Sequence, residues 1–248
     1  SIHAKEKENK KEEKTVETSE TSINFPIAAL FGSGTSSVEP RKSGFYFGIG
    51  GNYAIPTRMK YESDPDLNTD FERSSGLNLK AGYQTREFFS IELNFDKYAS
   101  FGWEDNVPGY IRRTAYYVSE KPDMAFKGKA DLASFMLTGK WSASFSRIFK
   151  PFFVFGFGFI TVDHEIKKKW TFNDPVFKGQ SGSITYKDDD TVICFKTGIG
   201  ADFYVMKKVS LGFEASYIFA QNADLEEAVD TLEIGFVNFS LGTSYHFN

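Results

Sequence analysis

The sequence predicts an all-β fold, an eight-stranded antiparallel up-and-down transmembrane β-barrel with an N-terminal extension. Eight segments alternate strictly between apolar and small or polar residues, and no charge falls on the apolar face. Phenylalanine is abundant, with 27 residues among 248, and 17% of the chain is aromatic. The connections between the segments alternate between short and long, which is typical of barrels that cross an outer membrane.

The last segment shows the alternation most clearly. One face carries Val237, Phe239, Leu241, Thr243, Tyr245 and Phe247, and the other carries Asn238, Ser240, Gly242, Ser244 and His246. Because successive side chains of a strand point to opposite faces, this segment has one apolar side and one polar side. The same parity holds in the other segments. We therefore expect odd-numbered strand residues to face lipid and even-numbered ones to face the lumen.

The predicted strands follow from the limits of each alternating segment. In chain order they lie near 44–55, 75–84, 88–98, 130–145, 151–163, 191–205, 209–220 and 233–247. Each has at least roughly the 9–11 residues that a tilted strand needs to cross the hydrocarbon. The second, fourth and sixth connections are short, and short turns lie on the periplasmic side of such barrels. With an even number of strands, both chain ends are predicted to be periplasmic.

A soluble β-barrel or sandwich is the alternative, because its strands also alternate. In a soluble barrel the apolar face fills the interior, and eight strands leave room for only a modest filling of side chains. The stripe formed by Phe153, Phe155, Phe157 and Phe159 would overfill that space. The opposite face is rich in glycine and carries charges of both signs, which favours a tight polar lumen and an apolar exterior.

Composition excludes several classes of function. The formal net charge of −4 gives no basic surface for nucleic acid. No apolar run reaches the 18 residues of a transmembrane helix, and the single cysteine, Cys194, excludes an intrachain disulfide. No cofactor and no metal are expected. The acidic run Asp188–Asp190 has ligands suited to a hard cation, but a solvated acidic turn is the favoured interpretation.

Residues 1–43 are predicted to form a separate, largely irregular periplasmic extension, and residues 44–248 the barrel. Residues 5–20 consist almost entirely of charged and small polar residues, a composition that predicts disorder. An apolar nonapeptide follows at 23–31. It either packs beneath the barrel rim or docks on a partner protein. The docking side chains would be those of Ile23, Phe25, Ile27, Leu30 and Phe31.

The inward positions collect an unusual number of charges for a narrow interior. They are Lys80, Glu92, Asp96, Lys140, Lys196, Asp202, Glu214 and His246. Three lysines nearly balance four carboxylates, and unpaired charges are costly in a low-dielectric interior, so we expect an ion-pair network. The network either fills the barrel and fixes strand register or lines a very narrow ion path. Inward Phe152, Val154 and Ile160 argue against a wide pore.

The first, third, fifth and seventh connections are predicted to be long, polar loops; the first three of these lie at 56–74, 99–129 and 164–190, and the loops at 99–129 and 164–190 are rich in aromatic residues. The aromatic candidates are Trp103, Tyr110, Tyr116, Tyr117, Trp170 and Phe172. They mark either a contact surface for a protein or glycan, or strands that extend past the membrane and residues of the interfacial girdle. The consecutive lysines 167–169 are predicted to meet phosphates of lipopolysaccharide in the outer leaflet.

From residue 44 to 248 the chain resembles the eight-stranded outer-membrane barrels of Gram-negative bacteria, which include the OmpA transmembrane domain, OmpX and OmpW-like barrels. The topology, the opening GFYFGIGGNYAIP and the ending SLGTSYHFN carry the resemblance. The ending is similar to the family's C-terminal assembly signal, except that Asn248 follows the aromatic Phe247.

The resemblance implies a structural anchor or a partner-binding component of the outer membrane. The alternative is a narrow OmpW-like pore for ions or small molecules. Some barrels of this size modify lipids, and that chemistry needs a histidine with a serine and an acid. His164 lies between two acids and His246 lies in the last strand, but no nearby serine completes a triad in the sequence. We therefore expect no enzymatic activity.

Overall fold

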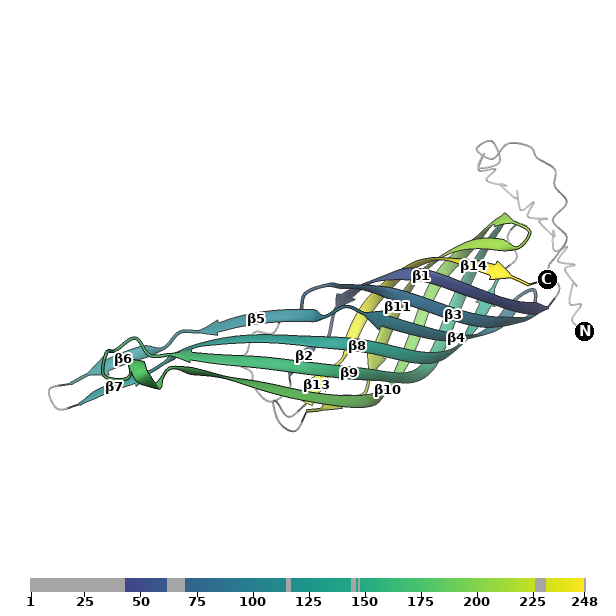
Figure 1. Cartoon of the computed structure of the whole chain (residues 1–248). Coiled ribbons are helices and arrows are strands. Elements are labelled where there is room, and N and C mark those ends of the chain that lie inside the picture. Colours follow the sequence, from purple (N-terminus) through teal and green to yellow (C-terminus); the bar gives the residue numbers. More distant parts are fainter. Residues whose placement is uncertain are drawn as a thin grey trace, which may run out of the picture. The chain divides into compact units, whose positions relative to one another are not determined.

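The computed structural model describes residues 43–61, 70–114, 117–143, 146, 148–225 and 231–247. Eight strands of its main sheet form a ring in which every neighbouring pair is antiparallel (Figure 1). They are β1 (Gly44–Pro56), β3 (Ser74–Arg86), β4 (Phe89–Tyr98), β8 (Asp123–Ser142), β9 (Phe149–Thr171), β10 (Gly182–Met206), β11 (Val209–Ala220) and β14 (Gly235–His246). The predicted eight-stranded barrel is confirmed.

The first and last strands close the ring. β1 pairs with β14 from Tyr46 opposite His246 to Pro56 opposite Phe236. The strands approach closely where two glycines face each other, because a Cβ atom on Gly50 would lie 2.5 Å from the carbonyl oxygen of Leu241. Paired residues have the same parity, so the odd-numbered face continues unbroken across the closing pair.

The parity assignment holds throughout the barrel. Odd-numbered apolar side chains of the ring strands are exposed or half-buried, and Phe157 of β9 is 53% exposed. Even-numbered neighbours such as Val154 and Ile160 are fully buried. The barrel therefore has a continuous apolar exterior and an interior filled by side chains.

Three strands are much longer than predicted. β8, β9 and β10 contain 20, 23 and 25 residues, and β5 (Phe101–Val107) pairs with the far part of β8. In Figure 1 these four strands continue past the ends of their neighbours. We call this part, formed by residues 101–107, 123–131, 163–171 and 182–190, the protruding sheet. The prediction of loops at 99–129 and 164–190 is therefore largely wrong, and the alternative, strands that extend beyond the apolar stripe, is confirmed.

The tip of the protruding sheet contains short elements. β6 (Tyr110–Arg113) and β7 (Val118–Lys121) form a hairpin, and the 3-10 helix η2 (Lys178–Gln180) lies in the connection from β9 to β10. Within the described ranges, no helix combines the length and apolarity needed to cross a membrane.

A second, three-stranded sheet forms at the end of the barrel that carries the long connections, which we call the loop end. It joins β2 (Lys60–Tyr61), β13 (Thr231–Glu233) and β12 (Ala223–Asp224). It thus unites the first and last long connections of the chain. Its core-facing residues Leu232 and Ala223 are fully buried, so these connections fold onto the barrel interior.

Candidate functional site

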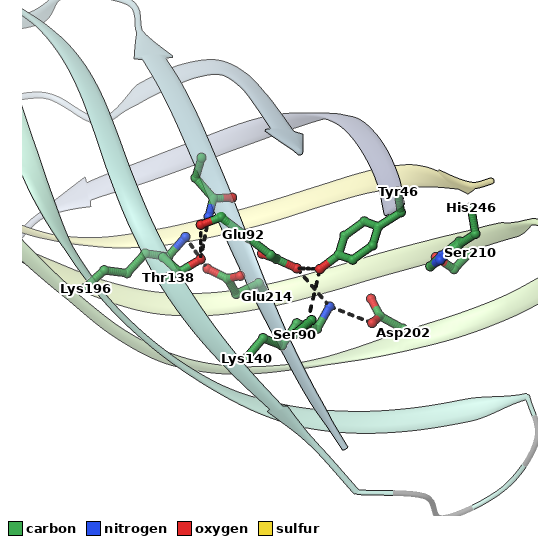
Figure 2. Close-up of polar contacts among 11 residues, drawn as sticks. Tyr46, Ser90, Glu92, Thr138, Lys140, Lys196, Asp202, Ser210, Glu214 and His246 are labelled. Carbon is green, nitrogen blue, oxygen red and sulfur yellow. Dashed lines mark hydrogen bonds and ion pairs between the residues drawn. The ribbon is translucent and has the colours of Figure 1, made fainter. Parts of the chain in front are cut away.

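The interior of the barrel has two parts with different chemistry. Charged and polar side chains fill the part nearer the short turns, which we call the turn end, and Figure 2 shows how they converge. Apolar side chains fill the part nearer the loop end. Both parts consist largely of even-numbered strand residues. The inward-facing side chains of the barrel therefore change from polar at the turn end to apolar at the loop end.

Lys140 of β8 is the centre of the charged part (Figure 2). Its Nζ atom lies 2.6 Å from Oδ2 of Asp202 on β10 and 3.6 Å from Oε1 of Glu92 on β4. The same ammonium lies 3.9 Å from the ring centroid of Phe152, a favourable cation–π position. The hydroxyl of Tyr46 donates a hydrogen bond to the same oxygen of Glu92. Lys140 thus links β8 to three other strands, through Glu92 on β4, Phe152 on β9 and Asp202 on β10.

Two further clusters complete the polar part. Lys196 of β10 lies 2.7 Å from Oε1 of Glu214 on β11. Asp96 accepts hydrogen bonds from the side-chain amides of Asn52 at 2.6 Å and Asn78 at 2.7 Å. Because each buried charge has an ion partner or hydrogen-bond donors, the desolvation cost of the network is offset.

The structure brings together six of the predicted lumen residues in these contacts: Glu92, Asp96, Lys140, Lys196, Asp202 and Glu214. Lys80 is half-buried, and a Cβ atom on Gly48 would lie 2.7 Å from its Cε atom. His246 instead lies 3.0 Å from the hydroxyl of Ser210 and stacks on Tyr46. The sequence analysis missed Tyr46, Asn52 and Asn78 because it considered only ionisable side chains. Their even numbers nevertheless place them on the inward face.

The apolar part closes the loop end of the barrel. The rings of Tyr98, Phe101 and Phe236 pack with centroids 5.2 to 6.0 Å apart. Leu225 and Leu232 from the last long connection are fully buried in the same cluster. The predicted interior contained isolated apolar positions but no such plug.

Trp103 corrects the prediction of an exposed aromatic contact residue, because it is only 2% exposed. The backbone between β4 and β5 leaves the regular alternation, and the amide of Ala99 donates to the carbonyl of Ser75. Odd-numbered residues of β5 consequently turn inward. The indole lies against Gly128, where an added Cβ atom would be 2.1 Å from Nε1. Its neighbour Phe71 comes from the first long connection.

The other predicted aromatic residues lie on or near the tip. Tyr110 at the start of β6 is 62% exposed, and Tyr117 at the turn between β6 and β7 is exposed as well. Trp170 is half-buried in β9 and donates from Nε1 to the carbonyl of Gln180 at 2.7 Å, and Phe172 packs on Phe177. Tyr116 and the predicted docking residues at 23–31 lie outside the described residues.

Carboxylates hold the hairpin at the tip in place. Glu120 of β7 accepts hydrogen bonds from the backbone amides of Asn173 and Asp174. Asp174 in turn forms an ion pair with Arg113 of β6. The backbone amide of Val176 and this arginine both favour the charged form of Asp174 and lower its pKa. The hairpin is therefore fixed to the connection between β9 and β10.

His164 lies in β9 and not in a loop, and it is almost fully buried. Burial lowers its pKa to about 4 despite the opposing charge of Asp188, so the imidazole is neutral at pH 7. It contributes to the wall of an open cleft of about 690 Å³, lined also by Lys129, Asp131, Asp163, Lys187 and Asp190. Among the described residues, no group of three or more histidine, cysteine or acidic side chains is arranged to hold a metal ion.

Comparison with known proteins gives the family. Residues 25–247 match the family model described as "Outer membrane protein beta-barrel domain". A search of curated proteins found no significant match.

Three solved structures with similar folds are distant in sequence. Neisserial surface protein A is 11% identical and has a TM-score of 0.45, over 84% of this chain and 100% of that chain. OprG from Pseudomonas aeruginosa is 13% identical with a TM-score of 0.42, over 85% and 99%. Outer membrane protein W of E. coli is 14% identical with a TM-score of 0.39, over 84% and 100%. The family match covers nearly the whole chain, which therefore belongs to the outer membrane protein beta-barrel domain family and is a protein of the bacterial outer membrane.

Proposed function

We propose that this protein is a non-conducting anchor in the outer membrane that presents the protruding sheet to a macromolecular partner outside the cell. The observation that carries this proposal is the combination of a barrel filled along its length with a sheet that is ordered far beyond it. A barrel that conducts needs neither a plug nor a long projection.

The contents of the lumen support the anchor over the pore. A conducting path past the turn end requires displacement of Lys140 from two carboxylates, which leaves buried charges without compensation. A path past the loop end requires water among Tyr98, Phe101 and Phe236. Between the strands at the turn end, the cavity beside Tyr46 and His246 measures only about 20 Å³. Because the lumen is filled in these ways, a narrow OmpW-like pore is the second candidate function, after the anchor.

The connections support the orientation. The links from β3 to β4 and from β10 to β11 are short turns, and such turns lie in the periplasm in this kind of barrel. That orientation places the protruding sheet outside the cell and both ends of the barrel domain in the periplasm.

The tip has the composition of a recognition surface. Tyr110, Ile111, Tyr117 and Val118 expose apolar area on the hairpin, and Arg112 is exposed between them. Tyrosine and arginine dominate the binding energy of many protein interfaces. The carboxylate contacts of Glu120 and Asp174 hold this surface in one conformation, which reduces the entropy lost on binding.

Photo-crosslinking tests the proposal. A photoreactive phenylalanine analogue replaces Tyr110 at the tip or, as a control, Lys207 in the short turn between β10 and β11. Irradiation of intact cells should give a discrete adduct from position 110, and position 207 should not give the same adduct. Adducts from position 207 alone would indicate a partner on the periplasmic side, which would contradict the proposal. The absence of any adduct from 110 with externally supplied or cell-surface components would contradict it as well.

A further inference from the structure

The outward face of the protruding sheet carries charges in bands that follow the strand register. Phe135, Phe159 and Ile193 are direct cross-strand neighbours and form the last apolar row of the exterior. Four residues further out, Asp131, Asp163 and Asp189 form an acidic row. The three aspartates are exposed or half-buried, and like charges directly opposite each other on a sheet are unfavourable.

Beyond the acidic row the same face becomes basic. The next rows are formed by Lys129, Glu165 and Lys187, by Lys127, Lys167 and Thr185, and by Ala125, Lys169 and Ser183. We call the five lysines of these rows the lysine face. Within these three rows and the adjoining strand β5, the five lysines face two glutamates, Glu104 and Glu165, so the rows carry a net charge of +3.

The lysines of this face are accessible to a ligand. The side chains of Lys127 and Lys187 are 71% and 72% exposed. Their ion pairs with Glu104 and Glu165 are open to solvent, and exposed pairs of this kind contribute little free energy. A phosphate can therefore compete for these ammonium groups. Lys168 points to the other face of the sheet, where it lies over Phe126, so the expected contact of three consecutive lysines is corrected to Lys167 and Lys169.

The distance of the acidic row and of the lysine rows from the bilayer determines which phosphates each can contact. At a rise of about 3.3 Å per residue and a tilt of about 40°, the acidic row stands about 10 Å above the last apolar row. The lysine rows stand about 15–25 Å above it by the same estimate. The headgroup layer of a bilayer leaflet is only about 5–8 Å thick. Phospholipid phosphates therefore reach the acidic row at most, where aspartates repel them.

We propose that the lysine face binds phosphate groups on the saccharide portion of an outer-leaflet glycolipid, and that the acidic row beneath it disfavours ordinary anionic phospholipids. The ligand needs phosphates on sugars that stand beyond the bilayer surface. In the cell, the site depends on the proposed orientation of the barrel, because only an outward sheet meets the outer leaflet. Binding in micelles does not depend on that orientation.

The test uses the full chain folded in detergent micelles and titrated with rough lipopolysaccharide that carries phosphorylated core sugars. Microscale thermophoresis reports binding. The variant Lys127→Gln/Lys167→Gln/Lys187→Gln should bind at least about tenfold more weakly, because three phosphate contacts are removed. The control Lys121→Gln/Lys168→Gln/Lys208→Gln loses the same charge at sites away from the lysine face, and its affinity should stay within about twofold of the unmodified chain.

Two further ligands separate the sources of phosphate. Lipopolysaccharide from which the core phosphates have been removed should bind the unmodified chain as weakly as the triple variant binds the intact glycolipid. Phosphatidylglycerol should not compete. Equal affinities of the two triple variants, or effective competition by phosphatidylglycerol, would overturn the proposal. Because crosslinking at Tyr110 reports on the tip alone, a failure here is distinguishable from a failure of the proposed function.

Discussion

Replacement of Lys140 by methionine is expected to lower the free energy of unfolding of the barrel by about 3–5 kcal/mol. The ammonium lies 2.6 Å from Asp202 and 3.6 Å from Glu92, and all three side chains are almost fully buried. Methionine is unbranched and only one atom shorter than lysine, but it leaves two carboxylates facing each other in a low-dielectric interior. Breaking a buried ion pair from one side costs much more than an exposed pair contributes.

Urea unfolding of the protein folded in detergent measures this effect. A triple variant with Lys140→Met, Glu92→Gln and Asp202→Asn removes all three charges and should recover much of the lost stability. Lys121→Met, at an exposed position of β7, is the matched control and should change stability by less than about 0.5 kcal/mol. A small effect of Lys140→Met, similar to that of the control, would show that the network is hydrated and exchanges with water.

Replacement of Phe157 by arginine is expected to cost about 1–3 kcal/mol, because this residue lies inside the apolar band, one row below its outer edge. Phe157 is one of the outward phenylalanines of β9, and its cross-strand neighbours are Leu137 and Phe195. An arginine there has no polar neighbour on the exterior and must bend toward the interface. Refolding yield into lipid vesicles and the urea midpoint in those vesicles measure the cost.

A depth series provides the control for this prediction. Thr161→Arg lies four residues further along the same face and should cost no more than about 1 kcal/mol, because it is near the interface. Phe157→Leu keeps the position apolar and should be nearly neutral. Equal costs for Phe157→Arg and Thr161→Arg would contradict the placement of the membrane.

The barrel itself could be predicted from the sequence because two constraints act on every strand residue. A residue at an odd position meets lipid and one at an even position meets a narrow interior, so alternation persists through each segment. Phe155, Val154 and their neighbours on β9 obey it without exception. The charged lumen residues followed from the same parity.

The protruding sheet and the apolar plug could not be predicted in the same way. Beyond the membrane the outward face needs no apolar residue, so Lys167 and Lys169 in a strand look like a loop in sequence. Trp103 is buried because the irregularity at Ala99 shifts the parity of β5, which depends on a contact with distant Ser75. The plug unites Phe71, Leu225 and other residues from connections far apart in the chain, so tertiary contacts alone reveal it.

Single-channel recording in planar bilayers tests the central claim, that the filled barrel is an anchor and not a channel. The lysine–carboxylate network and the aromatic plug predict no conductance, or only small and intermittent events, across the physiological voltage range. Lys140→Met with Glu214→Gln disturbs both ion-pair clusters while leaving the plug at Tyr98, Phe101 and Phe236 intact, so it should not open a steady path. Large and steady channels from the unmodified protein, comparable to those of general porins, would contradict the account.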